Sequence, residues 1–168
     1  MQTSETAIKQ IARYEGSRNS AYKDSEGLWT IGVGHLIRND ELDLIKKHLT
    51  DDEVLALFKR DLAVREVLLN SIIHNMSASV AKKWNMDNPI MPSQQQYDAM
   101  MSFLYNAGQG NLQSSTWFQL FFQGKLLEAS DSLAQWGSKQ WKTSPGLKIR
   151  RQWEANMLLK QEETHAGT

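Results

Sequence analysis

The sequence feature that most constrains the fold is a long amphipathic segment that begins at residue 50. Thr50-Asp51-Asp52-Glu53 forms a capping box, in which a hydroxyl and a carboxylate satisfy free amides at a helix start. The apolar side chains that follow recur on one helical stripe, with one acid among them. The stripe comprises Val54, Leu57, Phe58, Asp61, Leu62, Leu68, Leu69, Ile72 and Ile73. A helix reaching to about His74 would be roughly 35 Å long at ~1.5 Å per residue, which suits a strut between two lobes.

Other segments also carry helix signals. A first helix is expected from about Ser4 to Glu15, where Gly16 stops it, and a second capping box at Ser93 and Gln96 opens another that Gly108 and Gly110 end. The stretch 85–93 contains two prolines and breaks regular structure. Shorter helices are expected at about 116–123, 125–136 and 147–162.

The segment from Ala21 to Leu36 has a different character. Aromatic and β-branched residues flank the turn sequence Asp24-Ser25-Glu26-Gly27, which predicts a small β-hairpin. Gly32 and Gly34 follow. A lone G-x-G is a weak phosphate-binding signal, and we interpret these glycines as a tight or twisted strand that lines a cleft. The fold class predicted from these elements is α+β, mostly helical with one small sheet.

Composition excludes several classes of protein. The 168 residues contain no cysteine, which rules out a disulfide framework, a thiolate nucleophile and a zinc finger. The balance of 19 basic and 19 acidic residues argues against a dedicated nucleic-acid binder. The polar N-terminus lacks the features of a signal peptide, and no apolar run is long enough to span a membrane, so we expect a cytoplasmic protein.

The neutral total conceals a polarised charge pattern. Residues 40–66 hold eight acids and five bases, whereas residues 135–153 hold five bases and no acid. Those five are Lys139, Lys142, Lys148, Arg150 and Arg151. Such a run is usually a solvated face, and the alternative is a binding surface for an anionic partner.

Three residues near the N-terminus suggest acid catalysis when they are taken together. Glu15 continues the apolar stripe of the first helix, so burial is expected to raise its pKa and let it protonate a leaving group; the alternative is a surface glutamate at a helix end. Asp24 opens the hairpin turn, and Thr30 lies on the strand that returns from it. Alone, each has an ordinary structural explanation, a turn-forming aspartate and a strand threonine.

The spacing of Glu15, Asp24 and Thr30, which leads into Gly32-Val33-Gly34-His35-Leu36, resembles the signature of the phage-type lysozymes, glycoside hydrolase family 24. The resemblance covers nearly the whole chain. It includes Tyr14-Glu15-Gly16, Ala21-Tyr22-Lys23-Asp24, Gly27-Leu28-Trp29-Thr30-Ile31-Gly32, Leu49-Thr50, Phe58 with Asp61, FLYNAGQG at 103–110, Ser115-Thr116, and Gly146-Leu147 with Arg150-Arg151.

The resemblance implies a muramidase that cleaves the β-1,4 bond between N-acetylmuramic acid and N-acetylglucosamine in peptidoglycan. Glu15 matches the general acid, Asp24 the second carboxylate, and Thr30 the hydroxyl that helps hold the attacking water. Carboxylates far enough apart to admit that water give inversion at the anomeric carbon, the outcome we favour. The implied fold is a single lysozyme domain, 1–168. Its N-terminal lobe is expected at about 14–60, and its C-terminal lobe at about 75–168 together with the helix 4–15.

The resemblance also implies residues that contact the substrate and residues that stabilise the fold. The expected substrate contacts are Leu36, Tyr105, Asn106, Thr116 and Ser132, with Ser115 an alternative to Thr116. His35 is expected to pair with Asp61. A C-terminal arginine, Arg150 or Arg151, is expected to face the catalytic acid or the peptide of the substrate. Trp136, Trp141 and Trp153 are interpreted as core residues rather than as a sugar-stacking stripe.

The expected biology is that of a phage endolysin. It would be a monomer without cofactor or metal that binds peptidoglycan strands, does not insert stably into membranes and does not bind nucleic acid. It would stay in the host cytoplasm until a holin opens the membrane, and then act on the cell wall in the periplasm. Three alternatives remain at this point: a lysozyme delivered into competitors by a secretion apparatus, a catalytically silent peptidoglycan-binding module, and a nucleic-acid-binding helical protein.

Overall fold

The structure is a computed structural model that describes residues 1–160, and its internal contacts divide the chain into two compact units. The N-terminal unit is Ser4–Val64, and the C-terminal unit is Met1–Thr3 with Arg65 onward. The segment 4–15, which we expected in the C-terminal lobe, groups with the N-terminal unit. The single lysozyme domain and its lobes stay a prediction.

The N-terminal unit begins with helix α1 (Glu5–Glu15), whose ends lie where the sequence predicts them. The hydroxyl of Ser4 accepts a hydrogen bond from the amide of Ala7 at 3.2 Å, so the N-cap satisfies one of the free amides of the first turn. At the other end, Gly16 has a φ of 75°, a backbone conformation that glycine adopts without strain. The predicted helix is therefore confirmed at both boundaries.

A small antiparallel sheet follows, with β1 (Arg18–Lys23), β2 (Trp29–Gly32) and β3 (His35–Leu36) in sequential order. Tyr22 lies opposite Thr30 in the first pair, and Thr30 lies opposite Leu36 in the second. The predicted hairpin is thus confirmed, and the sheet of the described chain has a third, short strand in addition. A 3-10 segment, η1 (Asn39–Lys46), leads from the sheet toward α2.

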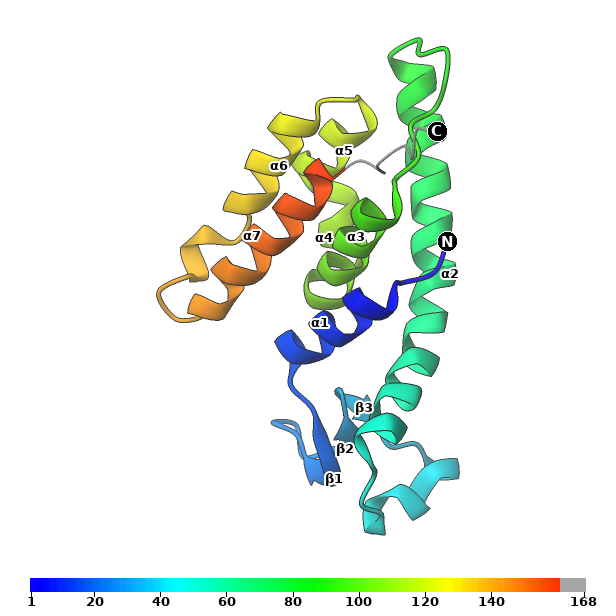
Figure 1. Ribbon diagram of the computed structural model, residues 1–168, viewed down its shortest axis with the longest axis vertical. Coiled ribbons are helices and arrows are strands. Elements are labelled where there is room, and N and C mark those ends of the chain that lie inside the picture. The colour runs from blue at the N-terminus through cyan, green and yellow to red at the C-terminus, as the bar shows by residue number, and fades with distance from the viewer. Residues whose placement is uncertain (161–168) are drawn as a thin grey trace, which may run out of the picture. The chain divides into compact units, whose positions relative to one another are not determined.

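Helix α2 (Asp51–Lys83) begins in the N-terminal unit and ends in the C-terminal unit (Figure 1). The predicted capping box is present, because the Thr50 hydroxyl accepts from the Glu53 amide at 3.2 Å and the Glu53 carboxylate accepts from the Thr50 amide at 3.1 Å. The predicted end near His74 is wrong. The helix continues to Lys83, about 50 Å at ~1.5 Å per residue, since no glycine or proline interrupts residues 75–83.

The described part of the C-terminal unit is helical. It contains α3 (Gln94–Ala107), α4 (Gln109–Ser114), α5 (Thr116–Phe122), α6 (Leu126–Gln135), the short η2 (Ser138–Gln140) and α7 (Pro145–Leu159). Figure 1 shows α6 and α7 side by side, and α7 also packs against α3. The predicted helices are confirmed, except that α7 ends at Leu159. Residues 161 and 162 of the predicted helix lie outside the described residues.

One helix of this unit was not predicted. Gly108 ends α3 with a φ of 86°, as expected, but Gly110 does not end a helix; it lies inside α4. The buried residues of α5 form an aromatic core with α3. The rings of Phe103 and Trp117 meet edge to face with centroids 5.1 Å apart, and both side chains are fully buried. The α+β class, mostly helical with a small sheet, is confirmed.

Candidate active site

Asp24 and Thr30 are joined through the backbone of Leu28. The carboxylate of Asp24 accepts hydrogen bonds from the amides of Glu26 and Leu28, each at 2.9 Å. The hydroxyl of Thr30 donates to the carbonyl of Leu28 at 3.2 Å, and Thr30 is only 3% exposed. The turn therefore brings these two predicted site residues together, with Asp24 half-buried at its start and Thr30 buried in β2.

Glu15 is the last residue of α1, and it is exposed. The expected burial of Glu15 is wrong, although the stripe that it continues is buried at Ala7, Ile8, Ile11 and Ala12. The helix ends at Glu15, and the chain turns away at Gly16 before another apolar turn can form. Burial thus does not supply the desolvation that the sequence predicts for this carboxyl group.

Leu36, a predicted substrate contact, is half exposed on β3 opposite Thr30. Gly32, the last residue of β2, does not line a cleft as predicted. Gly34 lies in the turn between β2 and β3 with a φ of 68°. Gly32 has a φ of 64°, and a Cβ placed there would lie 3.6 Å from Leu57 and Val54 of α2. These glycines therefore allow a left-handed backbone at the end of β2, and Gly32 faces protein rather than an open cleft.

His35 lies between two carboxylates. Its Nδ1 is 2.8 Å from Asp61 Oδ2, which confirms the predicted pair, and its Nε2 is 2.8 Å from Glu41 Oε2. Glu41 also forms ion pairs with Arg38 at 3.1 Å and with Arg60 at 2.9 Å. Because both ring nitrogens face carboxylate oxygens, only the doubly protonated imidazolium donates to both at once.

The ion pairs around Glu41 affect its protonation. Burial acts to raise the pKa of Glu41, but the hydrogen bond from His35, the backbone amide of Arg38 and the nearby positive charges outweigh it. The net pKa of Glu41 lies below its ordinary value of 4.5. The roles of Glu41 and Arg60 are not predicted by the sequence pattern. The available signal was the density of charge in residues 40–66, which does not say which charges meet.

The C-terminal unit holds the other predicted contacts. Tyr105 and Asn106 are consecutive residues near the end of α3, where Tyr105 is half-buried and Asn106 is exposed. The guanidinium of Arg65 lies 4.3 Å from the centre of the Tyr105 ring, a cation–π contact that covers one face of the ring. Nothing in the sequence pattern pointed to Arg65.

Arg150 and Arg151 belong to a buried network rather than to an exposed face. Arg150 is 4% exposed, and Arg151 and Glu154 are fully buried. Arg151 donates to Glu154 and to Asn106, while Arg150 donates to the carbonyl of Ser102 at 2.8 Å. Burial raises the pKa of Glu154, although Arg151, Ser102 and Arg150 act to lower it.

The expected basic surface at residues 135–153 is therefore smaller than its sequence indicates. Two of its five bases are buried, and both form ion pairs with Glu154, one residue beyond the segment. The three lysines, Lys139, Lys142 and Lys148, are exposed.

Two hydroxyl residues at the start of α5 are distinguished by their burial. Ser115 is 6% exposed, and its hydroxyl donates to the carbonyl of Leu112 at 2.8 Å, whereas Thr116 is exposed. This favours Thr116 as the substrate contact. Ser132 is half-buried on α6. The three tryptophans interpreted as core residues, Trp136, Trp141 and Trp153, are also half-buried. The ring centroids of Trp136 and Phe103 lie 4.8 Å apart.

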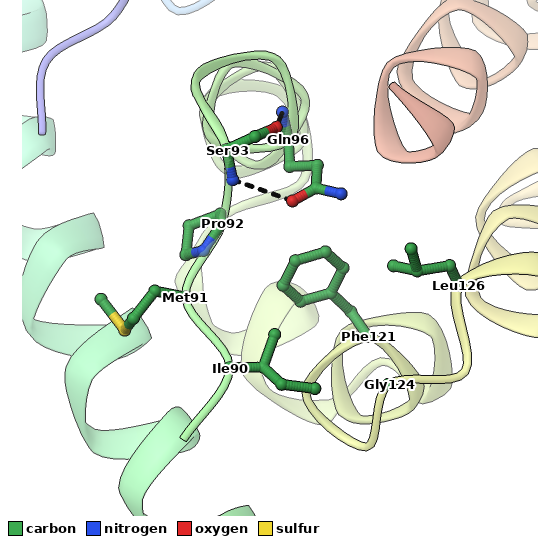
Figure 2. Close-up of a pocket in the computed structure, with 8 residues that line it drawn as sticks. All are labelled: Ile90, Met91, Pro92, Ser93, Gln96, Phe121, Gly124 and Leu126. Atoms are coloured by element: carbon green, nitrogen blue, oxygen red, sulfur yellow. Dashed lines mark hydrogen bonds between the residues drawn. The ribbon is translucent and has the colours of Figure 1, made fainter. Parts of the chain in front are cut away.

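A cavity of about 440 Å³ lies in the C-terminal unit, and none of the predicted site residues lines it. Figure 2 shows Phe121 and Ile90 facing each other across it, with Leu126 beyond. The polar side chains at its edge are Ser93 and Gln96. Gln96 accepts from the amide of Ser93 at 2.8 Å and donates to the carbonyl of Leu158 at 2.9 Å, so its amide is already occupied by the protein.

Comparison with known proteins identifies the family of the chain. The sequence model of the family described as "Phage lysozyme" matches residues 12–154. An endolysin of Bacillus phage B103 is 30% identical over 99% of this chain, and the aligned region covers 57% of that longer protein. A SAR-endolysin of Enterobacteria phage P21 is 32% identical over 86% of this chain and 77% of that protein.

Comparison of three-dimensional structures leads to the same family. The crystal structure of a P22 lysozyme mutant is 28% identical and superimposes with a TM-score of 0.73, covering 95% of this chain and 99% of that one. The lysozyme-like fold predicted from the sequence is thereby confirmed. The family match spans most of the chain and includes Glu15, Asp24 and Thr30. The chain belongs to the phage lysozyme family.

Proposed function

We propose that this chain is an endolysin that hydrolyses the β-1,4 bond between N-acetylmuramic acid and N-acetylglucosamine in peptidoglycan, for lysis of a host cell. The observation that carries the proposal is the turn in which Leu28 joins the Asp24 carboxylate to the Thr30 hydroxyl. Family membership supports the reaction class. The names of the relatives, endolysin and SAR-endolysin, support the role in lysis.

Glu15 is the general acid in this proposal. Its exposed position at the end of α1 leaves the carboxyl group accessible to a glycosidic oxygen. In this role the carboxyl group gives its proton to the leaving oxygen as the glycosidic bond breaks.

Asp24 and Thr30 act on the water. Two backbone amides hold one oxygen of the Asp24 carboxylate, which leaves its other oxygen to accept a proton from the attacking water. The Thr30 hydroxyl, fixed by Leu28, accepts a hydrogen bond from the same water. A water held between the second carboxylate and the sugar gives an inverted product.

Leu36, Tyr105, Asn106, Thr116 and Ser132 bind the glycan in this proposal. Aromatic and apolar surface with a few amide and hydroxyl groups is the lining that a carbohydrate needs. Exposure of Leu36, Asn106 and Thr116 supports their availability to a ligand. The enzyme works as a monomer, forming one lysozyme domain.

Release to the cell wall is the remaining part of the proposal. None of the helices in residues 1–160 is long and apolar enough to cross a membrane. We place the enzyme in the host cytoplasm until a holin opens the membrane, after which it acts on peptidoglycan in the periplasm. Deleting the holin gene would delay lysis in that case, and lysis at the normal time without the holin would contradict this route.

The decisive experiment compares the parent with Glu15→Gln in clearing chloroform-treated Gram-negative cells. The variant is expected to lose clearing, with a circular dichroism spectrum that shows an unchanged fold. Glu128→Gln, which neutralises an exposed acid on α6, is the matched control and should clear at the parental rate. Parental clearing by Glu15→Gln would overturn the general-acid role.

Two product measurements complete the assignment. The mass of the released fragments separates hydrolysis, which adds water, from transglycosylation, which leaves an anhydro ring. Proton NMR of the freshly formed reducing end gives the anomer, and a retained β-anomer would contradict inversion.

A further inference from the structure

We propose that Arg151 is a positioning residue that fixes the side-chain amide of Asn106 with its NH₂ group outward, so that this subsite binds a carbonyl oxygen of the substrate. The inference rests on the proposed lysozyme function and deepens it at one of its predicted contacts. Arg151 acts through Asn106, and Asn106 is the group that touches the substrate.

The guanidinium of Arg151 is held in one place. Its side chain is fully buried, and its central carbon lies 4.6 Å from the ring centre of Phe103 and 5.4 Å from that of Trp136. It also donates to the buried carboxylate of Glu154. Two aromatic contacts and an ion pair at 0% exposure leave the guanidinium no room to swing away from Asn106.

The chemistry of the two groups decides which way the amide points. A guanidinium carries only N–H donors, so it bonds only the oxygen of an amide. The bond observed is from Arg151 to Asn106 Oδ1. The Nδ2 group is therefore on the side away from Arg151, and in residues 1–160 it makes no hydrogen bond to protein although Asn106 is exposed.

The outward group is a donor of more than ordinary strength. The positive charge beside Oδ1 polarises the amide and makes its N–H bonds better donors, as occurs in hydrogen-bonded chains. Such a group selects an acceptor oxygen. Asn106 is next in sequence to Tyr105, whose ring is covered on one face by Arg65, so an aromatic surface and a fixed donor lie on adjacent residues of α3.

Peptidoglycan offers carbonyl oxygens from two sources. Each sugar carries an acetamido group, and the stem peptide carries backbone amides. Both sources present the same chemistry to Nδ2, and they are separated by using peptidoglycan that lacks one or the other.

Asn106→Asp tests the donor directly. The variant keeps an oxygen that accepts from Arg151 and replaces the outward NH₂ with an oxygen that cannot donate. On intact peptidoglycan we expect KM to rise about tenfold, the effect of one lost hydrogen bond at an acceptor, with kcat nearly unchanged. The melting temperature should stay the same or rise, because Arg151 then faces a carboxylate. Asn88→Asp, at an exposed asparagine outside the predicted site, controls for the added negative charge.

Two modified substrates identify which carbonyl group of peptidoglycan accepts the hydrogen bond from Asn106. If the acetamido group is the partner, the KM penalty of Asn106→Asp disappears on N-deacetylated peptidoglycan. If the stem peptide is the partner, the penalty disappears on glycan strands stripped of peptide by an amidase. An unchanged KM on intact peptidoglycan, or the same penalty on all three substrates, overturns the inference.

The positioning role is tested with Arg151→Gln. Glutamine both donates and accepts, so the orientation of the Asn106 amide is no longer forced. KM should therefore rise, and kcat should stay nearly unchanged, as in Asn106→Asp. Arg151→Lys keeps donors only and should recover part of the affinity. These variants change a buried residue and are compared only if their melting shows a folded protein, whereas the Asn106→Asp result stands by itself. A parent that clears no bacterial wall would refute the proposed function instead, which is a distinct outcome.

Discussion

Asp24 and Thr30 bind opposite ends of one residue: the amide of Leu28 donates to Asp24 Oδ1 at 2.9 Å, and its carbonyl accepts from Thr30 Oγ1 at 3.2 Å. The two side chains are thus linked through the backbone of one residue. Asp24 consequently has two roles, as an acceptor that shapes the turn and as a charged group in the proposed chemistry. The two roles are separable by mutation.

Asp24→Asn removes the charge and keeps an oxygen that accepts from both amides. We expect clearing activity to fall by about 100-fold or more, because an amide is not a base for water. The free energy of unfolding, measured by urea denaturation, should change by less than about 0.5 kcal/mol. Asp24→Ala also loses the acceptor oxygen and should lower the free energy of unfolding by about 1–2 kcal/mol more than Asp24→Asn does. Parental activity in Asp24→Asn would show that Asp24 serves the turn alone.

Thr30→Val is nearly isosteric and removes only the hydroxyl. We expect at least about tenfold slower clearing, since one hydrogen bond to the attacking water is lost, and a destabilisation of about 1 kcal/mol from the unpaired Leu28 carbonyl. Thr30→Ser is the matched control: it keeps the hydroxyl and loses one buried methyl, for a similar stability cost of about 1 kcal/mol. Equal activities of the Val and Ser variants would exclude a role for the hydroxyl.

Glu41 makes stability depend on pH. Because its folded pKa lies below 4.5, its carboxylate stabilises the fold above that pH, and this contribution is lost as pH falls through the folded pKa. The melting temperature should therefore decrease from pH 5 to pH 3, and Glu41→Gln should melt lower at pH 7 with a shallower decrease. A flat curve for the parent between pH 7 and pH 3 would contradict this account.

A matched variant separates the effect of the ion pairs around His35 from that of exposed ion pairs. Asp40→Asn breaks an exposed pair with Arg38 and should leave the slope of melting temperature against pH as in the parent, because exposed pairs contribute little. Asp43 and Glu53, whose pKa values are also lowered by hydrogen bonds, remain in both proteins, so part of the pH dependence should persist in Glu41→Gln.

Glu154→Gln tests the buried network. Removing the buried Glu154 carboxylate takes from Arg150 and Arg151 the counter-charge that they share. We expect a loss of about 3–5 kcal/mol in the free energy of unfolding, measured in urea, as in other broken buried pairs. Glu128→Gln should stay within about 0.5 kcal/mol of the parent. If the two variants unfold at the same urea concentration, the network does not stabilise the fold.

Local signals located most of the elements. Ser4 with Gly16, Thr50 with Glu53, and Ser93 with Gln96 act within a few residues, so the helix ends that they mark are where the sequence predicts them. Where a local signal was absent, the prediction failed. Residues 75–83 contain no residue that marks the end of a helix, so the length of α2 was not predictable. Gly110 lies inside α4, although glycine is common at helix ends.

The sequence by itself determined the family, the α+β class and the candidates Glu15, Asp24 and Thr30, because these depend on residue type and spacing along the chain. Tertiary structure decided the environment of each charge. Glu15 is exposed rather than buried, His35 meets Glu41 as well as Asp61, and Arg151 is enclosed with Glu154 and Asn106. Burial and ion pairing depend on which distant residues meet in space, and the periodicity of a single helix carries no information about its neighbours.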